Sequence, residues 1–342
     1  MIHLIILLLS ACLLAANTPA HTADTIGLSF FSVPVPGRGG VMDITLWYPA
    51  TAGGTPVLVG DSPLFKGEAA QQGAPAATGS HPLILLSHGG LKSGPFIGAW
   101  MASRLASKGF VVAMMRQPDP QTMTSEESIH EIWLRPADLS AALTAIEKDS
   151  TLPAKIDRNR IGVLGFLIGG TSALSLAGGN LDPESFARSC NPDGTGVDCA
   201  EFASAGIDLR SIDRQKLSRT HLDTRVKAAV VIDPEFGANF APDSLKHISI
   251  PVRLINLGTP ETLWPGLRAS GLQDVIPNAR YDLLTGASQY SAFSECKPAG
   301  TVILREEGEE PLCDDAEGTN RSSIHDRLAE MVAAAFRTDL PQ

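Results

Sequence analysis

The residues that first suggest chemistry form the stretch Gly165-Phe166-Leu167-Ile168-Gly169-Gly170. An apolar run at 160–164 precedes it and a helix-like run at 171–177 follows, which predicts a strand, a sharp turn and a helix. Turns of the pattern G-x-S-x-G expose a nucleophilic serine at their apex. Here the apex is Leu167, whose hydrocarbon side chain has no lone pair to attack a carbonyl and no proton to give up. The sequence therefore predicts the turn but not the nucleophilic attack that a serine at its apex performs.

Other side chains near this turn could carry a relocated reaction centre. Ser172 falls one turn into the expected helix, where a hydroxyl commonly bonds a backbone carbonyl. Ser87 and His88 are neighbours at a strand end, and adjacent residues of a strand face opposite ways. His130 and His325 fall in peripheral segments. We expect structural roles for all of them, and a relocated hydrolytic centre remains the alternative.

Three charged residues suit structural roles as well. Asp233 precedes a proline at a strand end, which favours a turn. Arg135 and Asp138 lie one helical turn apart, and we expect them to form an ion pair. Neither a His/carboxylate cluster at metal-ligand spacing nor a G-x-G-x-x-G pattern occurs. We therefore expect neither a metal nor a dinucleotide cofactor.

The composition is that of an ordinary globular protein with an acidic surface, and the length suits one large α/β domain or two small ones. Its 342 residues are 44% hydrophobic and 19% charged, with a formal net charge of −10. That charge disfavours binding to nucleic acid or to anionic membranes. The acidic run at 306–310 is short, and we expect a solvated loop there.

The first residues predict export. Residues 1–16 are mostly apolar, too short to span a membrane, and are followed by small residues, which is typical of a signal peptide ending at Ala20 or Ala23. We expect a signal peptide at 1–23, a periplasmic or secreted protein, and one domain at 24–342. Leu9-Ser10-Ala11-Cys12 also resembles a lipoprotein motif, so a lipid anchor at Cys12 is the alternative, disfavoured by the short preceding segment.

Four cysteines remain after removal of the signal peptide, which suggests disulfides in an exported chain. Four cysteines allow three pairings. Proximity in the sequence favours Cys190 with Cys199 and Cys296 with Cys313. The first pair falls in a segment with little apolar periodicity, at about 183–223, which we interpret as an insertion that covers the sheet edge as a lid.

Strands alternate with helices along the rest of the chain. The apolar runs at 82–87, 110–115, 161–164, 226–233, 251–256 and 280–284 predict strands, and 96–108, 135–148 and 325–336 predict helices. Two alternating segments, 26–33 and 42–49, predict antiparallel edge strands, and 50–81 predicts a long loop. This order predicts a mostly parallel sheet covered by helices on both faces.

Several of these segments occur in the order and spacing of a known family. They are Leu85-Leu86-Ser87-His88-Gly89-Gly90, Arg135-Pro136-Ala137-Asp138, Arg160-Ile161-Gly162-Val163-Leu164-Gly165, Ala228-Ala229-Val230-Val231-Ile232-Asp233-Pro234 and Pro251-Val252-Arg253-Leu254-Ile255. From about Ile26 onward the chain resembles the secreted bacterial esterases that are similar to dienelactone hydrolase and platelet-activating-factor acetylhydrolase. The resemblance implies an α/β-hydrolase fold and cleavage of carboxylic esters by a serine, a histidine and an acid.

Placed on this chain, the resemblance puts the serine at Leu167, the acid at Glu261 and the histidine at Gln289. Glutamate can replace aspartate as the acid. A glutamine amide cannot accept a proton near neutral pH. Two of the three catalytic roles thus fall to side chains that cannot perform them.

The backbone parts of the implied site do not depend on those side chains. The resemblance implies oxyanion donors at Ile168 and at Gly90 or Leu91, after the His88-Gly89 turn. Gly165 and Gly169 permit the close approach of strand and helix that the turn needs. A bulky residue at the strained apex requires either a relaxed turn or compensating apolar packing of Leu167.

Three functional hypotheses follow. The first is a non-hydrolytic protein that binds an ester or lipid-like small ligand in the former reaction pocket. The second is an active carboxylic-ester hydrolase that uses displaced residues. The third, weaker, is a partner-binding module built on the segments that contain the cysteines.

Overall fold

The computed structural model describes residues 25–91, 93–116, 118 and 120–342. The predicted signal peptide and Cys12 lie outside the described residues. None of the described helices is long and apolar enough to cross a membrane.

The described chain forms one sheet of ten strands, in the order β10-β9-β8-β7-β5-β6-β2-β1-β4-β3. The strands are β1 Thr25–Val35, β2 Gly40–Ala50, β3 Thr55–Val59, β4 Glu68–Gln72, β5 His81–Ser87, β6 Val111–Met115, β7 Ile156–Phe166, β8 Ala228–Ile232, β9 Val252–Leu257 and β10 Ala279–Leu284. The six strands from β10 to β6 pair in parallel, whereas β2 pairs antiparallel with both β6 and β1. The mostly parallel sheet and the antiparallel N-terminal strands are confirmed.

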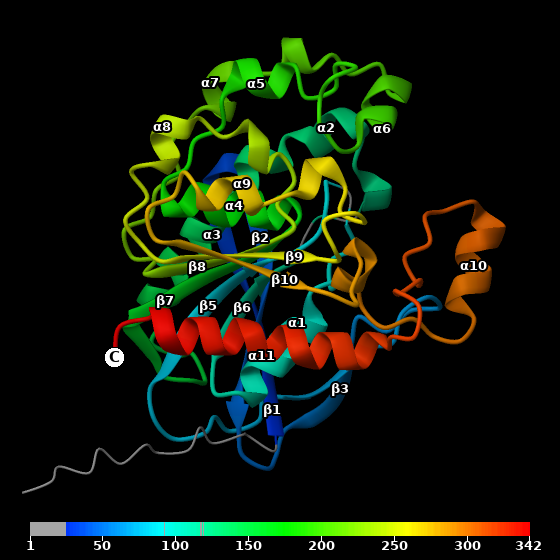
Figure 1. The fold of residues 1–342 in the computed structure, drawn as a ribbon. Helices are drawn as coiled ribbons and strands as arrows, with labels where there is room; N and C mark the ends of the chain where they lie inside the picture. The colour runs from blue at the N-terminus through cyan, green and yellow to red at the C-terminus, as the bar shows by residue number, and fades with distance from the viewer. Residues whose placement is uncertain (1–24, 92, 117, 119) are drawn as a thin grey trace, which may run out of the picture.

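Helices cover both faces of the sheet (Figure 1). The longer helices α3 (Glu131–Lys148) and α4 (Ile168–Ala177) pack on one face, and α1 (Ala99–Ser107) and α11 (Arg321–Asp339) pack on the other. Each layer buries its own apolar core, to which the central strands contribute alternate residues. Strands buried on both faces must be apolar throughout, which explains the continuous apolar runs in the sequence.

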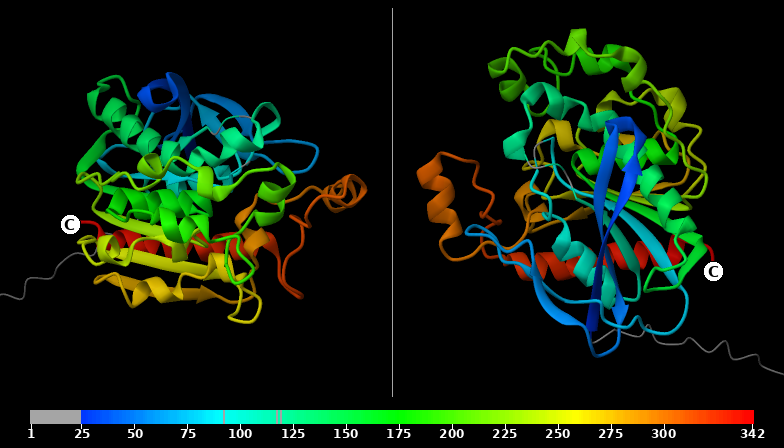
Figure 2. Two further views of the ribbon diagram at one scale, coloured as in Figure 1. Left: turned by 90° about the horizontal axis from the view of Figure 1, so that it is seen from above. Right: turned by 180° about the vertical axis from the view of Figure 1, so that it is seen from behind.

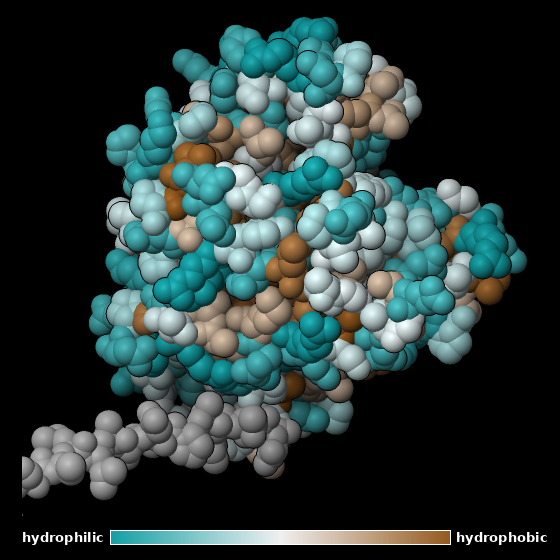
Figure 3. Space-filling model, viewed as in Figure 1, coloured by the Kyte–Doolittle hydropathy of each residue, from teal (hydrophilic) through white to brown (hydrophobic). Residues whose placement is uncertain are grey.

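The shorter helices belong to the connections. They are η1 Pro36–Arg38, η2 Pro120–Thr122, α2 Ser125–Ile129, α5 Pro183–Ala187, α6 Cys199–Ser204, η3 Leu209–Ser211, α7 Arg214–Leu217, η4 Gly237–Asn239, α8 Pro242–Leu245, η5 Pro265–Leu267, α9 Ser270–Gln273, η6 Gln289–Ala292 and α10 Gly300–Glu307. Figure 2 shows that α5, α6 and α7 gather at one end of the molecule and that the segment containing α10 projects from its side. On the face drawn in Figure 3, apolar side chains form small separate groups among polar ones.

Both predicted disulfides are present. Cys190 is bonded to Cys199 across 5.4 Å between Cα atoms, and Cys296 to Cys313 across 5.6 Å. The first bridge joins the turn after α5 to the start of α6. The second ties the chain after α10 back to the chain before it.

Two expectations about the elements were wrong. The expected loop at 50–81 contains β3 and β4, which extend the sheet beyond β1, so β1 and β2 are not edge strands. The helix expected from Arg135 begins at Glu131, because Pro136 is accommodated inside its second turn. In the first case the pairing with β1 determines the structure more than the local composition does.

Candidate functional site

Leu167 occupies the apex of a sharp turn between β7 and α4. Its backbone has φ 57° and ψ −122°, a conformation that side chains with a Cβ rarely adopt. A Cβ atom on Gly169 would lie 2.0 Å from the Ser87 carbonyl oxygen, and one on Gly165 would lie 1.9 Å from the Gly169 oxygen. The two glycines therefore let strand, turn and helix pack together. The turn has not relaxed, and the Leu167 side chain is buried, with 7% exposed.

A pocket of about 560 Å³ lies over Leu167, at the carboxyl ends of the parallel strands. Leu167, Gln289, Gly90 and Leu91 all line it, so the structure brings together four of the predicted site residues. Glu261 is not among its described lining residues. The Glu261 side chain is exposed and bonded by the Thr259 hydroxyl, which lowers the pKa of its carboxyl. Its role as an acid therefore stays a prediction.

The predicted oxyanion loop is held from behind by Arg135. This buried guanidinium donates from Nη1 to the Gly89 carbonyl at 2.8 Å and from Nη2 to the Gly90 carbonyl at 2.7 Å. In a planar trans peptide the N–H points opposite to the carbonyl. The N–H groups of Gly90 and Leu91 therefore point away from Arg135. Ile168 is the first residue of α4, where N–H groups have no acceptor within the helix.

The partner of Arg135 differs from the expected one. Arg135 Nε donates to Glu131 at 3.0 Å, whereas Asp138 receives its hydrogen bond from Arg38 at 2.7 Å. Arg38 also bonds Glu131, so the four side chains form one mostly buried network. The prediction of an Arg135–Asp138 pair was wrong because a residue distant in sequence, Arg38, supplies the partner.

Two histidines, His88 and His325, are buried and serve the packing. His88 bonds the Ala292 carbonyl at 2.7 Å and stacks on Phe166, and burial lowers its pKa to about 3. His325 stacks on Trp100 and bonds the carbonyls of Ser291 and Phe293, and burial lowers its pKa to about 2.

No serine or threonine hydroxyl in the described chain is hydrogen-bonded to an imidazole. The Ser172 hydroxyl bonds the Ile168 carbonyl at 2.9 Å, as expected for a hydroxyl inside a helix. His130 packs beside Trp133. These positions offer no activated nucleophile in the part of the chain that the structure covers.

Glu235 is a pocket residue that the sequence did not single out. It follows the Asp233-Pro234 turn after β8, its N–H lies 3.3 Å from the Leu167 carbonyl, and its side chain lines the pocket with 6% exposed. Burial, and the charges of Asp198 and Glu310, raise the pKa of its carboxyl well above the ordinary range. The sequence could have indicated Glu235 by its position after β8, the strand beside β7, because open α/β sheets bind ligands at the carboxyl ends of their strands.

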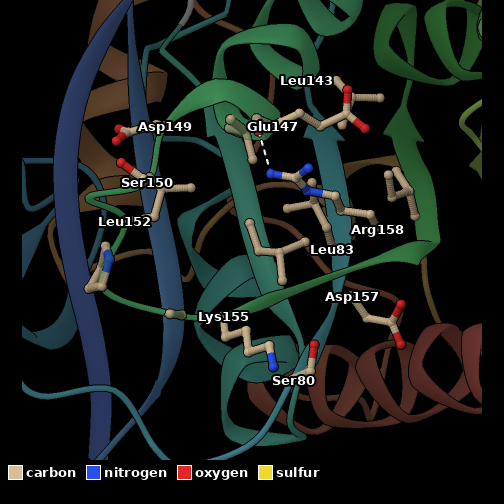
Figure 4. A pocket seen from close by; sticks show the side chains of 15 residues that line it. Ser80, Leu83, Leu143, Glu147, Asp149, Ser150, Leu152, Lys155, Asp157 and Arg158 are labelled. Atoms are coloured by element: carbon tan, nitrogen blue, oxygen red, sulfur yellow. Dashed lines mark hydrogen bonds between the residues drawn. The ribbon is translucent and has the colours of Figure 1, made fainter.

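A second hollow, of about 660 Å³, lies at the opposite end of the sheet (Figure 4). Leu83 and Leu143 line it beside Asp157, Lys155 and the Arg158 side chain, which donates to the Glu147 carbonyl. It is formed where β5 and β7 begin rather than where they end. The pocket over Leu167 is therefore the better candidate for a site.

No protein-family model matches this chain, and no curated protein matches it in sequence. Among solved structures it is similar to a ferulic acid esterase from Streptomyces cinnamoneus, with TM-score 0.60 and 18% identity over 95% of this chain and 92% of the other. It is also similar to a dienelactone hydrolase from Anabaena variabilis, with TM-score 0.48 and 14% identity over 92% of this chain and 98% of that one. Together with the strand order, the first similarity shows that this chain has an α/β-hydrolase fold.

Proposed function

We propose that this protein is an exported, non-hydrolytic member of the esterase-like α/β-hydrolase proteins and binds a carboxylic ester or similar acyl compound. The observation that carries the proposal is Leu167 itself. It holds the backbone conformation of a displayed nucleophile and lines the pocket together with Gln289. A methyl group and an amide cannot attack an ester or carry its proton.

Binding is supported by what remains. The pocket volume falls within the range of small-molecule sites. The buried Arg135 holds the carbonyls of Gly89 and Gly90, so the N–H groups of Gly90 and Leu91 point away from it. In this proposal those N–H groups donate to the carbonyl oxygen of the bound ester. Export is supported by the two disulfides and by the signal-like N-terminal segment.

Hydrolysis of short-chain nitrophenyl esters tests the proposal. We expect no turnover by the unchanged protein above that of its Leu167→Ala/Gln289→Ala variant. The Leu167→Ser/Gln289→His variant should gain about 10- to 100-fold over that control, as expected for a serine–histidine pair without an orienting acid.

The alanine variant is the matched control, because it removes the same two side chains without supplying a nucleophile or a base. Turnover by the unchanged protein that a serine-reactive phosphonate abolishes would establish an active hydrolase with displaced residues. No gain in the serine–histidine variant would contradict the assignment of this pocket as the former reaction centre.

A further inference from the structure

The pocket over Leu167 is acidic. Five of its described lining residues are carboxylic acids and none is Lys, Arg or His; the acids are Asp198, Glu201, Glu235, Glu309 and Glu310. They come from three segments: the start of α6, the turn after β8, and the chain after α10. Lys92, between the lining residues Leu91 and Ser93, lies outside the described residues. The run at 306–310, expected to be a solvated loop, thus supplies part of the pocket wall.

Glu235 is the group that points to a ligand. Its Oε2 is fully buried and has no hydrogen-bond partner, and its Oε1 would lie 3.2 Å from a Cβ atom placed on Gly90. The nearby Arg135 uses its guanidinium on Glu131 and on the carbonyls of the oxyanion loop. Burying a carboxyl group without a partner is costly, and a ligand that supplies one removes that cost.

Aromatic side chains complete the lining. Trp264 meets Tyr290 edge to face, with ring centroids 6.3 Å apart, and Phe293 lies beside them in the wall. Aromatic faces combined with carboxylates favour organic cations. In the described chain no three His, Cys, Asp or Glu side chains converge as metal ligands, so a compact inorganic ion fits this wall less well.

From these contacts we propose that the pocket selects a cationic ester: an alkylammonium group placed against Glu235, Glu310 and the Trp264–Tyr290 pair, with the ester carbonyl at the N–H groups of Gly90 and Leu91. The inference rests on the proposed function, because it names the ligand class for the same pocket. This ligand carries a positive charge, whereas the nitrophenyl esters used to test hydrolysis are neutral.

Acetylcholine and 3,3-dimethylbutyl acetate provide the test, because they share shape and ester and differ only in charge. Titration calorimetry on the full chain should show acetylcholine bound about 10-fold more tightly than the neutral ester, with a difference that shrinks at high salt. An opposite charge in contact with a carboxyl favours its ionised form. The bound alkylammonium group should therefore ionise Glu235, and Glu235→Gln should remove most of that difference. The matched control is Glu330→Gln, on the surface of α11, which should preserve it.

The outcomes separate the two proposals. Equal affinity for the two esters would overturn the cation inference and leave the proposed ester binding standing. Binding of neither ester would overturn both. A charge preference that survives in Glu235→Gln would show that the rim acids Glu309 and Glu310, rather than the buried carboxyl, select the ligand, which would overturn the role given to Glu235. The melting temperature of each variant, measured without ligand, shows whether it is folded.

Discussion

At the scale of single residues, Leu167 combines a strained backbone with a well-packed side chain. A positive φ in a residue with a Cβ costs about 1–3 kcal/mol. The side chain belongs to the core cluster between the sheet and α3/α4, and that burial offsets the strain. The turn therefore persists without the hydroxyl that it displays in a serine hydrolase.

This combination predicts an unusual order of stability. Glycine in place of alanine normally destabilises by about 0.5–1 kcal/mol. At position 167 only glycine adopts the backbone conformation without strain, so Leu167→Gly should be more stable than Leu167→Ala by about 1 kcal/mol in urea unfolding. The control is Leu328, buried within α11, where the glycine variant should be the less stable one. The same order at both positions would mean that the turn is not strained.

At the scale of elements, the two disulfides hold the walls of the pocket. Cys199 begins the helix that carries Glu201, and Cys313 directly follows Leu312, another lining residue. The bridges close short loops that have little core of their own. Each such bridge stabilises a protein by about 2–4 kcal/mol.

Removing the second bridge should therefore loosen one wall selectively. Cys296→Ala/Cys313→Ala should lower the free energy of unfolding by about 3 kcal/mol and open the chain between 297 and 312 to limited proteolysis. Cys190→Ala/Cys199→Ala is the matched variant, and its new cuts should fall between 191 and 198. Mass spectrometry of the fragments locates the cuts. Cuts that fall outside these intervals would show that the bridges do not restrain these loops.

The elements also show how far the sequence alone could reach. The buried parallel strands could be predicted, because short continuous apolar runs such as 82–87 are typical of strands that are buried on both faces of a sheet. β4 could not, because Glu68–Gln72 is a poor strand former that is extended only through its pairing with β1 and β3.

The same division holds in the site. Leu167 and Gln289 could be predicted from local motifs. Glu235 and the acidic walls could not, because only the packing of three distant segments brings them together.

At the scale of the whole molecule, buried ionisable groups act on stability in opposite directions. Burial lowers the pKa of His88 and His325, so protonation in the unfolded chain weakens the fold as the pH falls below about 6.5. Burial raises the pKa of Asp233 to about 7 and that of Glu235 well above its ordinary value. The folded chain then holds protons that the unfolded chain releases, and stability falls as the pH rises through about 7.

A substitution at Asp233 measures the second effect, the loss of stability at higher pH that a buried carboxyl with a raised pKa causes. Its Oδ1 accepts hydrogen bonds from Asn256 and from the Leu257 N–H, whereas its buried Oδ2 has no partner. Asparagine keeps the acceptor, tolerates the local φ of 44° and cannot ionise. Relative to Asp233→Asn, the unchanged protein should therefore lose about 3 kcal/mol of stability between pH 5 and pH 8. The histidine contributions cancel in this comparison.

Urea unfolding at four pH values measures this difference. The control is Asp243→Asn, at an exposed carboxylate whose pKa is lowered by Lys246. A lowered pKa completes its effect below pH 4, so that difference should stay constant from pH 5 to pH 8. A constant difference for Asp233→Asn as well would mean that Asp233 is ionised inside the folded protein throughout.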